Sequence, residues 1–138
     1  MPVPASIPTP TPTPAPVLDR LTTLVVDCAD PVALAEFYRQ ATGWELTHSE
    51  RDFAALAAAT GPGLAFSRVE GHRAPGWPEG RTRLHLDFTV TDPDDAAPAL
   101  LALGATRPEA QPGEGRWIVL LDPEGHPFCL VRATDEAN

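Results

Sequence analysis

The sequence is poor in basic residues and in cysteine, and it contains no long hydrophobic run. Its 138 residues include 10 Lys+Arg against 19 Asp+Glu, which gives a net charge of -9. Nucleic acid is excluded as a partner, because neutralising phosphates requires a basic surface. The two cysteines, Cys28 and Cys129, are too few for a disulfide scaffold. No segment approaches the ~18 apolar residues of a membrane span, so no membrane partner is expected.

Proline is abundant, and it is concentrated at the N-terminus. Seven of the 17 prolines fall within the first 16 residues. Proline lacks an amide hydrogen and has a fixed φ, so this stretch suits neither a helix nor a sheet. We expect residues 1–17 to form a disordered, dispensable Pro/Thr-rich tail; a ligand for a proline-binding domain is the alternative. The tail lacks the basic and apolar regions of a secretory signal, so a cytoplasmic protein is expected.

The remainder, residues 18–134, is predicted to be one domain with an internal repeat. Residues 21–44 and 84–106 each contain a β-rich run, an Asp-Pro pair, a helical pattern and a glycine. Asp30 and Asp92 suit the N-cap, where a carboxylate accepts from free amides, and each following proline suits the first helical position. The glycines suit the left-handed position after a helix.

Three short strand candidates follow each helix. Turn residues separate them, so each half is predicted as strand–helix–strand–strand–strand, with modules at about 20–69 and 83–133. A helix covers only one face of such a sheet, so the two modules are expected to pair. The strand candidates are residues 44–49, 53–58 and 64–69 in the first half, and 105–108, 116–121 and 128–132 in the second.

This repeat resembles the vicinal oxygen chelate superfamily, which includes glyoxalase I, extradiol dioxygenases, and fosfomycin and bleomycin resistance proteins. The segments ADPVALAEFYRQATGWEL, RLHLDFTV and LLDPEGHPFCLV are similar to those of glyoxalase-like domains. The resemblance covers residues 20–133. It implies an α+β fold in which two tandem βαβββ modules form a curled mixed sheet around a cavity. It also implies a homodimer.

The resemblance further implies four metal-ligand positions, one on the first and one on the last strand of each module. They fall on Thr23, on or next to Phe66, on His85 and on Cys129, and only His85 matches a glyoxalase I ligand. A catalytic metal needs about three protein ligands. We therefore expect no metal, no other cofactor and no glyoxalase I activity. A nonstandard divalent site that adds Asp87 to His85 and Cys129 is the alternative.

Strand alternation sorts the residues of the second module. If His85 faces the cavity, Asp87 does too, while Leu86 and Phe88 pack beneath the helix. His85 and Asp87 are the candidate catalytic pair, a base with an orienting carboxylate, although neighbours two residues apart rarely hydrogen-bond directly. The alternative is that both are only wall residues. Cys129 is expected to face the cavity as a small buried hydrophobe rather than a reactive thiol.

Aromatic residues complete the predicted binding site. Trp77, in the long loop between the modules, and Trp117, on a strand, are expected to face a ligand, whereas Trp44 is assigned to the core. Phe66 and Thr23 are included as cavity-lining residues by the resemblance. His126 is interpreted as a turn residue, with a place at the cavity mouth as the alternative. Arginines around the loop either steer an anionic ligand or pair with Glu70 and Glu79; they are Arg68, Arg73, Arg81 and Arg83.

Three functions remain compatible with these features. The first is a metal-free protein that binds or sequesters a small aromatic or heterocyclic molecule. The second is a lyase or isomerase that uses His85 and Asp87 or the nonstandard metal site. The third is a structural or regulatory module whose cavity is filled by its own side chains.

Overall fold

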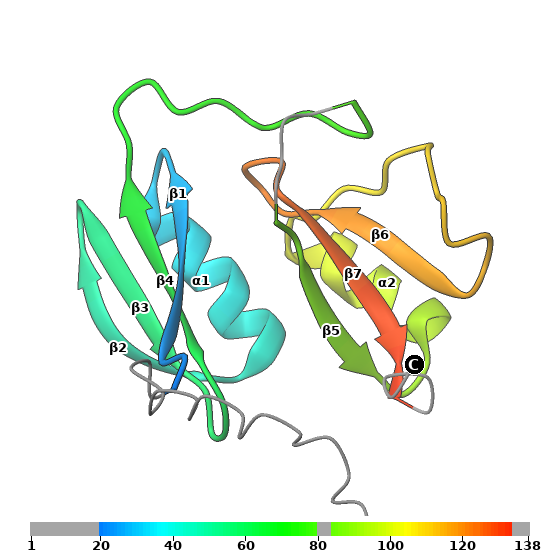
Figure 1. The fold of residues 1–138 in the computed structure, drawn as a ribbon, viewed down its shortest axis with the longest axis horizontal. Helices are drawn as coiled ribbons and strands as arrows, with labels where there is room; N and C mark the ends of the chain where they lie inside the picture. The colour runs from blue at the N-terminus through cyan, green and yellow to red at the C-terminus, as the bar shows by residue number, and fades with distance from the viewer. Residues whose placement is uncertain (1–19, 80–83, 134–138) are drawn as a thin grey trace, which may run out of the picture.

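The computed structural model describes residues 20–79 and 84–133 (Figure 1). The predictions for the tail at residues 1–17, and for Arg81 and Arg83, lie outside the described residues. Within the described part, no helix is both long enough and apolar enough to cross a membrane.

The first module is a four-stranded sheet with one helix. In chain order it consists of β1 (Thr23–Cys28), α1 (Pro31–Thr42), β2 (Glu45–Glu50), β3 (Phe53–Ala57) and β4 (Gly63–Arg68). The sheet order is β1-β4-β3-β2. Strands β1 and β4 are parallel because α1 and the β2–β3 hairpin lie between them in sequence, and the other pairs are antiparallel.

The second module repeats this plan with a smaller sheet. It consists of β5 (Leu86–Val90), α2 (Pro93–Leu103), β6 (Trp117–Leu121) and β7 (Pro127–Arg132). The order is β5-β7-β6, with β5 parallel to β7 and β6 antiparallel to it. The α+β class and the two related modules are therefore confirmed. Each module has its own sheet, and the two sheets do not close into a barrel.

The strand predicted at residues 105–108 is reduced to a single bridge between Thr106 and Leu121. Pro108, two residues further on, has no amide hydrogen to continue the ladder. The side chain of Gln111 takes over this role. Its amide nitrogen donates to the Val119 carbonyl at 2.9 Å, and its oxygen accepts from the Val119 amide at 2.9 Å. One side chain thus supplies both hydrogen bonds that a neighbouring strand would have made with Val119.

The predicted helix caps are confirmed. The Asp30 carboxylate accepts from the Ala33 amide at 3.2 Å, and that of Asp92 accepts from the Asp94 amide at 3.0 Å. Gly43 and Gly104 follow the two helices with φ of 74° and 119°. Both values are unfavourable for residues with a Cβ atom, so glycine ends each helix without strain.

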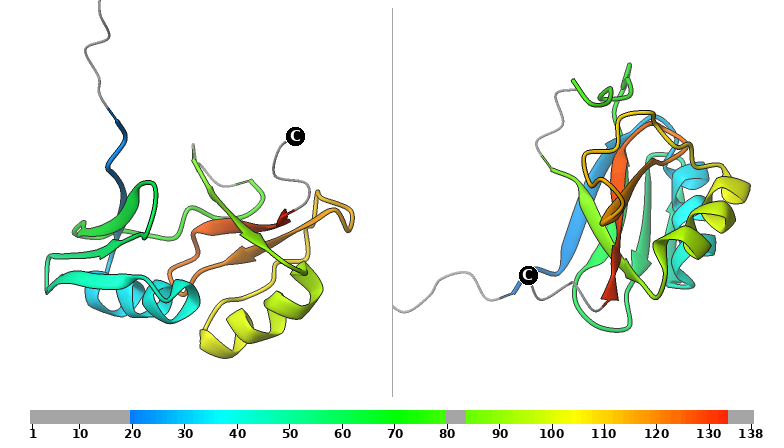
Figure 2. Two further views of the ribbon diagram at one scale, coloured as in Figure 1. Left: turned by 90° about the horizontal axis from the view of Figure 1, so that it is seen from below. Right: turned by 90° about the vertical axis from the view of Figure 1, so that its right-hand side faces the viewer.

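Both helices lie on the same side of the two sheets, so no helix of the described residues covers the opposite face of either sheet (Figure 2). The core lies under the helices and is continuous between the modules. Its centre is Tyr38, whose ring stacks on Phe66 at 5.4 Å and meets Phe128 edge-on at 6.1 Å. Trp44 packs against this core, 6.3 Å from the Phe88 ring, as predicted.

Candidate functional site

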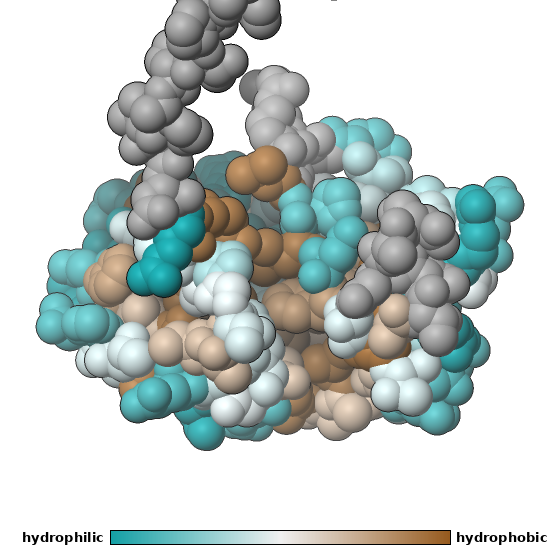
Figure 3. All heavy atoms as spheres, turned by 60° about the horizontal axis from the view of Figure 1, so that its bottom comes forward, coloured by the Kyte–Doolittle hydropathy of each residue, from teal (hydrophilic) through white to brown (hydrophobic). Residues whose placement is uncertain are grey.

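Two cavities in the described part of the chain are large enough to hold a small molecule. One, of about 560 Å³, lies between the modules and is walled largely by apolar and aromatic side chains, including Leu24, Trp44 and Phe88. Apolar residues gather between the two halves of the molecule in Figure 3. The other, of about 730 Å³, lies on the uncovered face of the second sheet and is called here the β5-β7-β6 cavity. Its walls are formed by Trp77, His85, Asp87, Pro112, Arg116, Trp117, Val119, Cys129 and Val131.

Strand register explains why these residues share one wall. Asp87 lies opposite Cys129, and Cys129 lies opposite Val119, so the three form one row across β5, β7 and β6. Val131 and Trp117 form the next row. Directly paired residues point to the same side of a sheet. Leu86 and Phe88 pack into the core from the other face, as strand alternation predicts.

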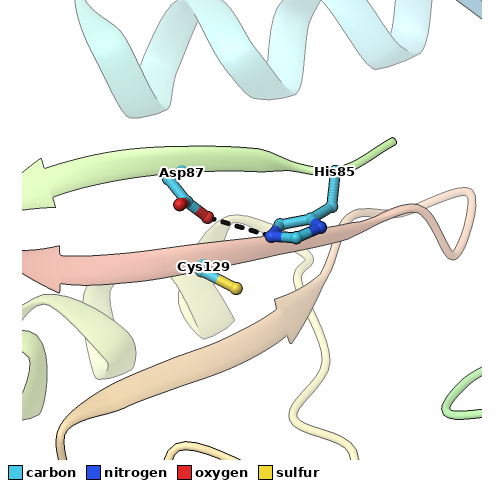
Figure 4. A group of neighbouring side chains, drawn as sticks. All are labelled: His85, Asp87 and Cys129. Carbon is cyan, nitrogen blue, oxygen red and sulfur yellow. Dashed lines mark ion pairs between the residues drawn. The ribbon is translucent and has the colours of Figure 1, made fainter. Parts of the chain in front are cut away.

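The candidate catalytic residues are in direct contact. His85 Nε2 lies 3.2 Å from Asp87 Oδ1, and both side chains are about half exposed (Figure 4). The contact is an ion pair when His85 is protonated, and it is not among the hydrogen bonds of the described residues, in line with the rule that residues two apart in a strand rarely hydrogen-bond. His85 precedes the first residue of β5, Leu86, so its backbone is outside the regular pleat. The pair has the composition of a base with an orienting carboxylate.

Cys129 lies beneath this pair and is buried, with 6% of its surface exposed. The pKa of its thiol is raised to about 12, mainly by burial and in addition by the negative charge of the nearby Asp87. The thiol is therefore protonated at neutral pH and is a poor nucleophile. These observations agree with the prediction of a small buried hydrophobe.

The superfamily's four metal positions do not come together in this chain. Thr23 is exposed on β1, in the other sheet, and does not line the β5-β7-β6 cavity. Phe66 is fully buried under α1 and stacks on Tyr38, so it lies in the core and not in the cavity. Neither position supplies a ligand, and the family's four-ligand set does not fit the residues present.

A different set of three donors does cluster. A ring nitrogen of His85, a carboxylate oxygen of Asp87 and the Sγ atom of Cys129 all lie within 4.8 Å of one another. This is the nonstandard set that the sequence left as an alternative. Cation binding there requires loss of the proton from a thiol that the surroundings keep protonated.

The two predicted tryptophans reach the cavity from different segments. Trp77, in the loop after β4, donates its indole N–H to the Ala110 carbonyl at 2.9 Å. This bond ties the loop to the segment before β6 and leaves only the ring for a ligand. Trp117 opens β6, and its ring packs so closely on Gly113 that a Cβ there would lie 2.7 Å from Trp117 Cδ2. Both rings are thus held in place by the surrounding chain.

Arg116 is a cavity residue that the sequence did not single out. Its guanidinium carbon lies 5.2 Å from the centroid of the Trp117 ring, and its Nε donates to the Gly113 carbonyl at 3.4 Å. Consecutive side chains of a strand point to opposite faces of the sheet, so strand alternation does not predict a contact between Arg116 and Trp117. Arg116 precedes the strand, however, and its long side chain can fold over the adjacent ring. Among the predicted arginines, Arg68 lies 3.1 Å from Glu70, as the ion-pair alternative predicted.

His126 lies in the turn between β6 and β7, as predicted, and it is not among the residues that line the β5-β7-β6 cavity; it also bonds to the first module. Its Nδ1 lies 2.9 Å from Asp122 Oδ2, and its Nε2 lies 2.8 Å from the carbonyl oxygen of Asp27 in the first module. Both partners are acceptors, so the two contacts together favour the doubly protonated ring, in which both nitrogens donate. Burial lowers the pKa of His126, but the Asp122 carboxylate, the Asp27 carbonyl and Glu124 together outweigh it and raise the pKa. His126 therefore connects the two modules.

These features define the class of protein. Two related modules, each with a helix on one side of its sheet, and a cavity on an uncovered sheet face constitute a vicinal oxygen chelate fold. The model of the glyoxalase-like domain family matches residues 23–131, and the chain belongs to this family. Among curated proteins, no match to the sequence was found.

Solved structures of low sequence identity share the fold. A glyoxalase/bleomycin resistance protein/dioxygenase family enzyme from Burkholderia phytofirmans PsJN is 23% identical, with a TM-score of 0.65, over 81% of this chain and 97% of its own. The bleomycin-binding protein from Streptomyces verticillus, complexed with copper(II)-bleomycin, is 22% identical, with a TM-score of 0.58, over 85% and 98%. A glyoxalase-related enzyme from Fulvimarina pelagi is 20% identical, with a TM-score of 0.61, over 85% and 90%.

Proposed function

We propose that this protein binds and sequesters a small planar organic molecule in the β5-β7-β6 cavity, without a metal. The observation that carries the proposal is the presence of two indole rings and the His85–Asp87 pair on the walls of one cavity of about 730 Å³. Cavities for small organic ligands measure roughly 300–1,000 Å³ and combine apolar walls with a few polar groups. This cavity has that size and composition.

The preset positions of the two rings support a binding role. The Trp77–Ala110 hydrogen bond fixes one ring, and the close contact with Gly113 fixes the other. A wall that is ordered before the ligand arrives reduces the entropic cost of binding. The structural likeness to a protein solved with bleomycin bound is consistent with this role.

A thermal-shift screen with aromatic metabolites and antibiotics tests the proposal, because a ligand of the native state raises its stability. Replacing Trp117 by Ala should weaken binding of any hit by roughly 1–3 kcal/mol, the scale of a lost aromatic contact. Trp44→Phe is the matched control, because Trp44 packs against the core away from this cavity. Equal affinity of the Trp117→Ala variant and the unaltered protein would contradict the proposal.

A second candidate function is a lyase or isomerase. The 3.2 Å contact between His85 Nε2 and Asp87 Oδ1 favours it, because a carboxylate beside an imidazole can orient a general base. The variant His85→Ala separates the two functions. In a binding protein it should change affinity modestly; in an enzyme it should abolish turnover and leave affinity nearly unchanged.

We further propose that the protein forms a homodimer that covers its open sheet face. Both helices lie on one side of the sheets, and Val25 on the opposite face of β1 is 57% exposed. Sheet edges also remain available for pairing, and two-fold symmetry is the usual arrangement of a homodimer. Light scattering should give twice the chain mass of 14.7 kDa at micromolar concentration; a value equal to one chain would exclude the dimer.

A further inference from the structure

We propose that the β5-β7-β6 cavity selects an aromatic carboxylate, with Arg116 as the residue that binds its anionic group. This inference rests on the proposed binding function and names its ligand class. The relevant observation is a guanidinium in the cavity wall, 5.2 Å from the centroid of the Trp117 ring. The aromatic wall and the guanidinium of this cavity match the two parts of such a ligand, its planar ring and the carboxylate attached to it.

Among the described arginines, Arg116 combines a place in the cavity wall with the lack of an ion-pair partner; Arg20, Arg51, Arg73 and Arg107 also lack a partner but do not line the cavity. All 10 basic residues of the chain are arginines. Arg39, Arg68 and Arg132 each have a carboxylate oxygen within 4 Å, at 2.6, 3.1 and 3.5 Å. Among the described residues, no carboxylate lies within 4 Å of Arg116. The guanidinium is instead positioned by the Gly113 carbonyl and the indole ring.

The remaining polar groups of the cavity favour an acceptor on the ligand. The wall carboxylate, Asp87, is already in contact with His85 at 3.2 Å. The Trp77 N–H is used by the Ala110 carbonyl. Arg116 uses only Nε on the Gly113 carbonyl, so its two terminal nitrogens are available as donors. Two terminal N–H groups in a plane match the two oxygens of a carboxylate.

The net charge of the chain also bears on how an anionic ligand could bind. The chain carries a net charge of -9, so its overall field repels anions. An anionic ligand therefore needs a cation at the site itself. Arg116 supplies a permanent one, because a guanidinium stays protonated in proteins. The guanidinium lies over the Trp117 ring, and Trp77 lines the same cavity, so a ligand whose ring packs against Trp77 can present its carboxylate to Arg116.

Calorimetric titration with 2-naphthoate and its neutral analogue 2-naphthamide tests the inference. The unaltered protein should bind 2-naphthoate about tenfold or more tightly, the scale of a charge-assisted hydrogen bond. Arg116→Gln should abolish this preference, so that the variant binds the two probes with equal affinity. Arg116→Lys should retain part of it, because the charge remains but the two-pronged geometry is lost. Arg51→Gln is the control, since it changes the net charge equally at an exposed residue outside the cavity.

The outcomes distinguish this inference from the proposed function. The role of Arg116 is overturned if the unaltered protein binds the two probes equally, or if a folded Arg116→Gln variant keeps the preference. Neither result contradicts the proposed binding of planar molecules in the cavity. If Arg51→Gln removes the preference to the same extent, the selection is due to net charge and the inference also fails. If neither probe binds at millimolar concentration, both the inference and the planar-ligand function that it rests on are contradicted.

Discussion

The hydroxyl of Tyr38 donates a hydrogen bond of 2.8 Å to the carboxylate of Asp122, and this bond joins the helix of the first module to the last hairpin of the second. Asp122 is almost fully buried, with 2% of its surface exposed. It also accepts from the backbone amides of Glu124 and His126 and from the His126 ring. A buried carboxylate is tolerated because each of its oxygens has donors. This network, which is distinct from the ligand cavity, connects the two modules through polar groups.

Removal of Asp122 should therefore destabilise the protein more than removal of the Tyr38 hydroxyl. Asp122→Ala leaves a buried hydroxyl, two amides and an imidazolium without their acceptor, and should lower the free energy of unfolding by about 3–5 kcal/mol. Tyr38→Phe leaves Asp122 its other donors and should lower it by about 1–2 kcal/mol. Urea denaturation measures both. Arg39→Gln, which breaks an exposed ion pair with Glu36, is the control and should have no measurable effect. Equal losses for the Asp122 and Tyr38 variants would contradict this account.

The stability of the protein should decrease as the pH rises above about 6.5. The folded pKa of His126 is raised above its ordinary value of 6.5, so its stabilising contribution is fully present below that value. It is lost as the pH rises through the folded pKa, because the cation that Asp122 and the Asp27 carbonyl require is deprotonated. The charged or titratable groups near the ring are Asp122, Glu124 and the stacked His72, whose ring lies at 5.4 Å.

Denaturation curves between pH 5.5 and 8.5, a range chosen around the ordinary histidine pKa, test this prediction. The variant His126→Gln should flatten the dependence of the free energy of unfolding on pH. His48→Gln, at an exposed position on β2, should leave it unchanged. If the free energy of unfolding of His126→Gln depends on pH as strongly as that of the unaltered protein, other groups cause the pH dependence and the prediction is wrong.

Gly113 should be required for the cavity as well as for stability. In Gly113→Ala the added Cβ would lie 2.5 Å from the Trp117 carbonyl oxygen and 2.7 Å from Trp117 Cδ2, so the ring must move. Overpacking of this kind costs about 1–3 kcal/mol. We expect the melting temperature and the affinity for aromatic ligands to fall together.

Gly43→Ala separates these two effects. Gly43 has φ of +74°, and a Cβ added there would have no atom within 4 Å, so its substitution strains the backbone without touching the cavity. This variant should lose stability and keep its ligand affinity. If both glycine variants lose affinity equally, the loss reflects general destabilisation rather than displacement of Trp117.

Purified protein should retain no stoichiometric nickel, zinc, iron or manganese. Thr23 and Phe66 supply no ligands, and Cys129, in the remaining cluster of three donors, has a thiol whose pKa is raised to about 12. Methylglyoxal–glutathione isomerisation should accordingly be absent. Elemental analysis measures the metal content. About one tightly held ion per chain that disappears in His85→Ala would refute the prediction and favour the nonstandard metal site.

The helices and most strands follow from local signals. Asp30 caps α1 and Asp92 caps α2, and these interactions involve residues at most three positions apart. The alternation from His85 to Val90 likewise predicted which side chains enter the core, because the polar residues occupy the odd positions and the apolar residues the even positions. The shared wall of His85, Asp87 and Trp117 follows from that alternation and from pairing within one sheet.

Other features depend on partners that are distant in sequence. Strand β4 contains the apolar run Leu64, Ala65, Phe66, and such a run does not indicate which face of the strand is buried. The position of Phe66 in the core is evident only from its packing against Tyr38. The strand predicted at residues 105–108 is reduced to one bridge, because Pro108 cannot donate to a ladder and the Gln111 side chain pairs with Val119 instead.

Both helices, most strands, their repeat and one polar strand face can be predicted from the sequence, because hydrophobic periodicity and helix capping act over a few residues. The tertiary structure decided the separation into two sheets, the contact of Arg116 with Trp117, and the network of Tyr38, Asp122 and His126. Tyr38 and Asp122 are 84 residues apart, and no local pattern specifies their contact. Their pairing arises only when packing of the two modules removes both groups from water, since each buried polar group then requires a partner.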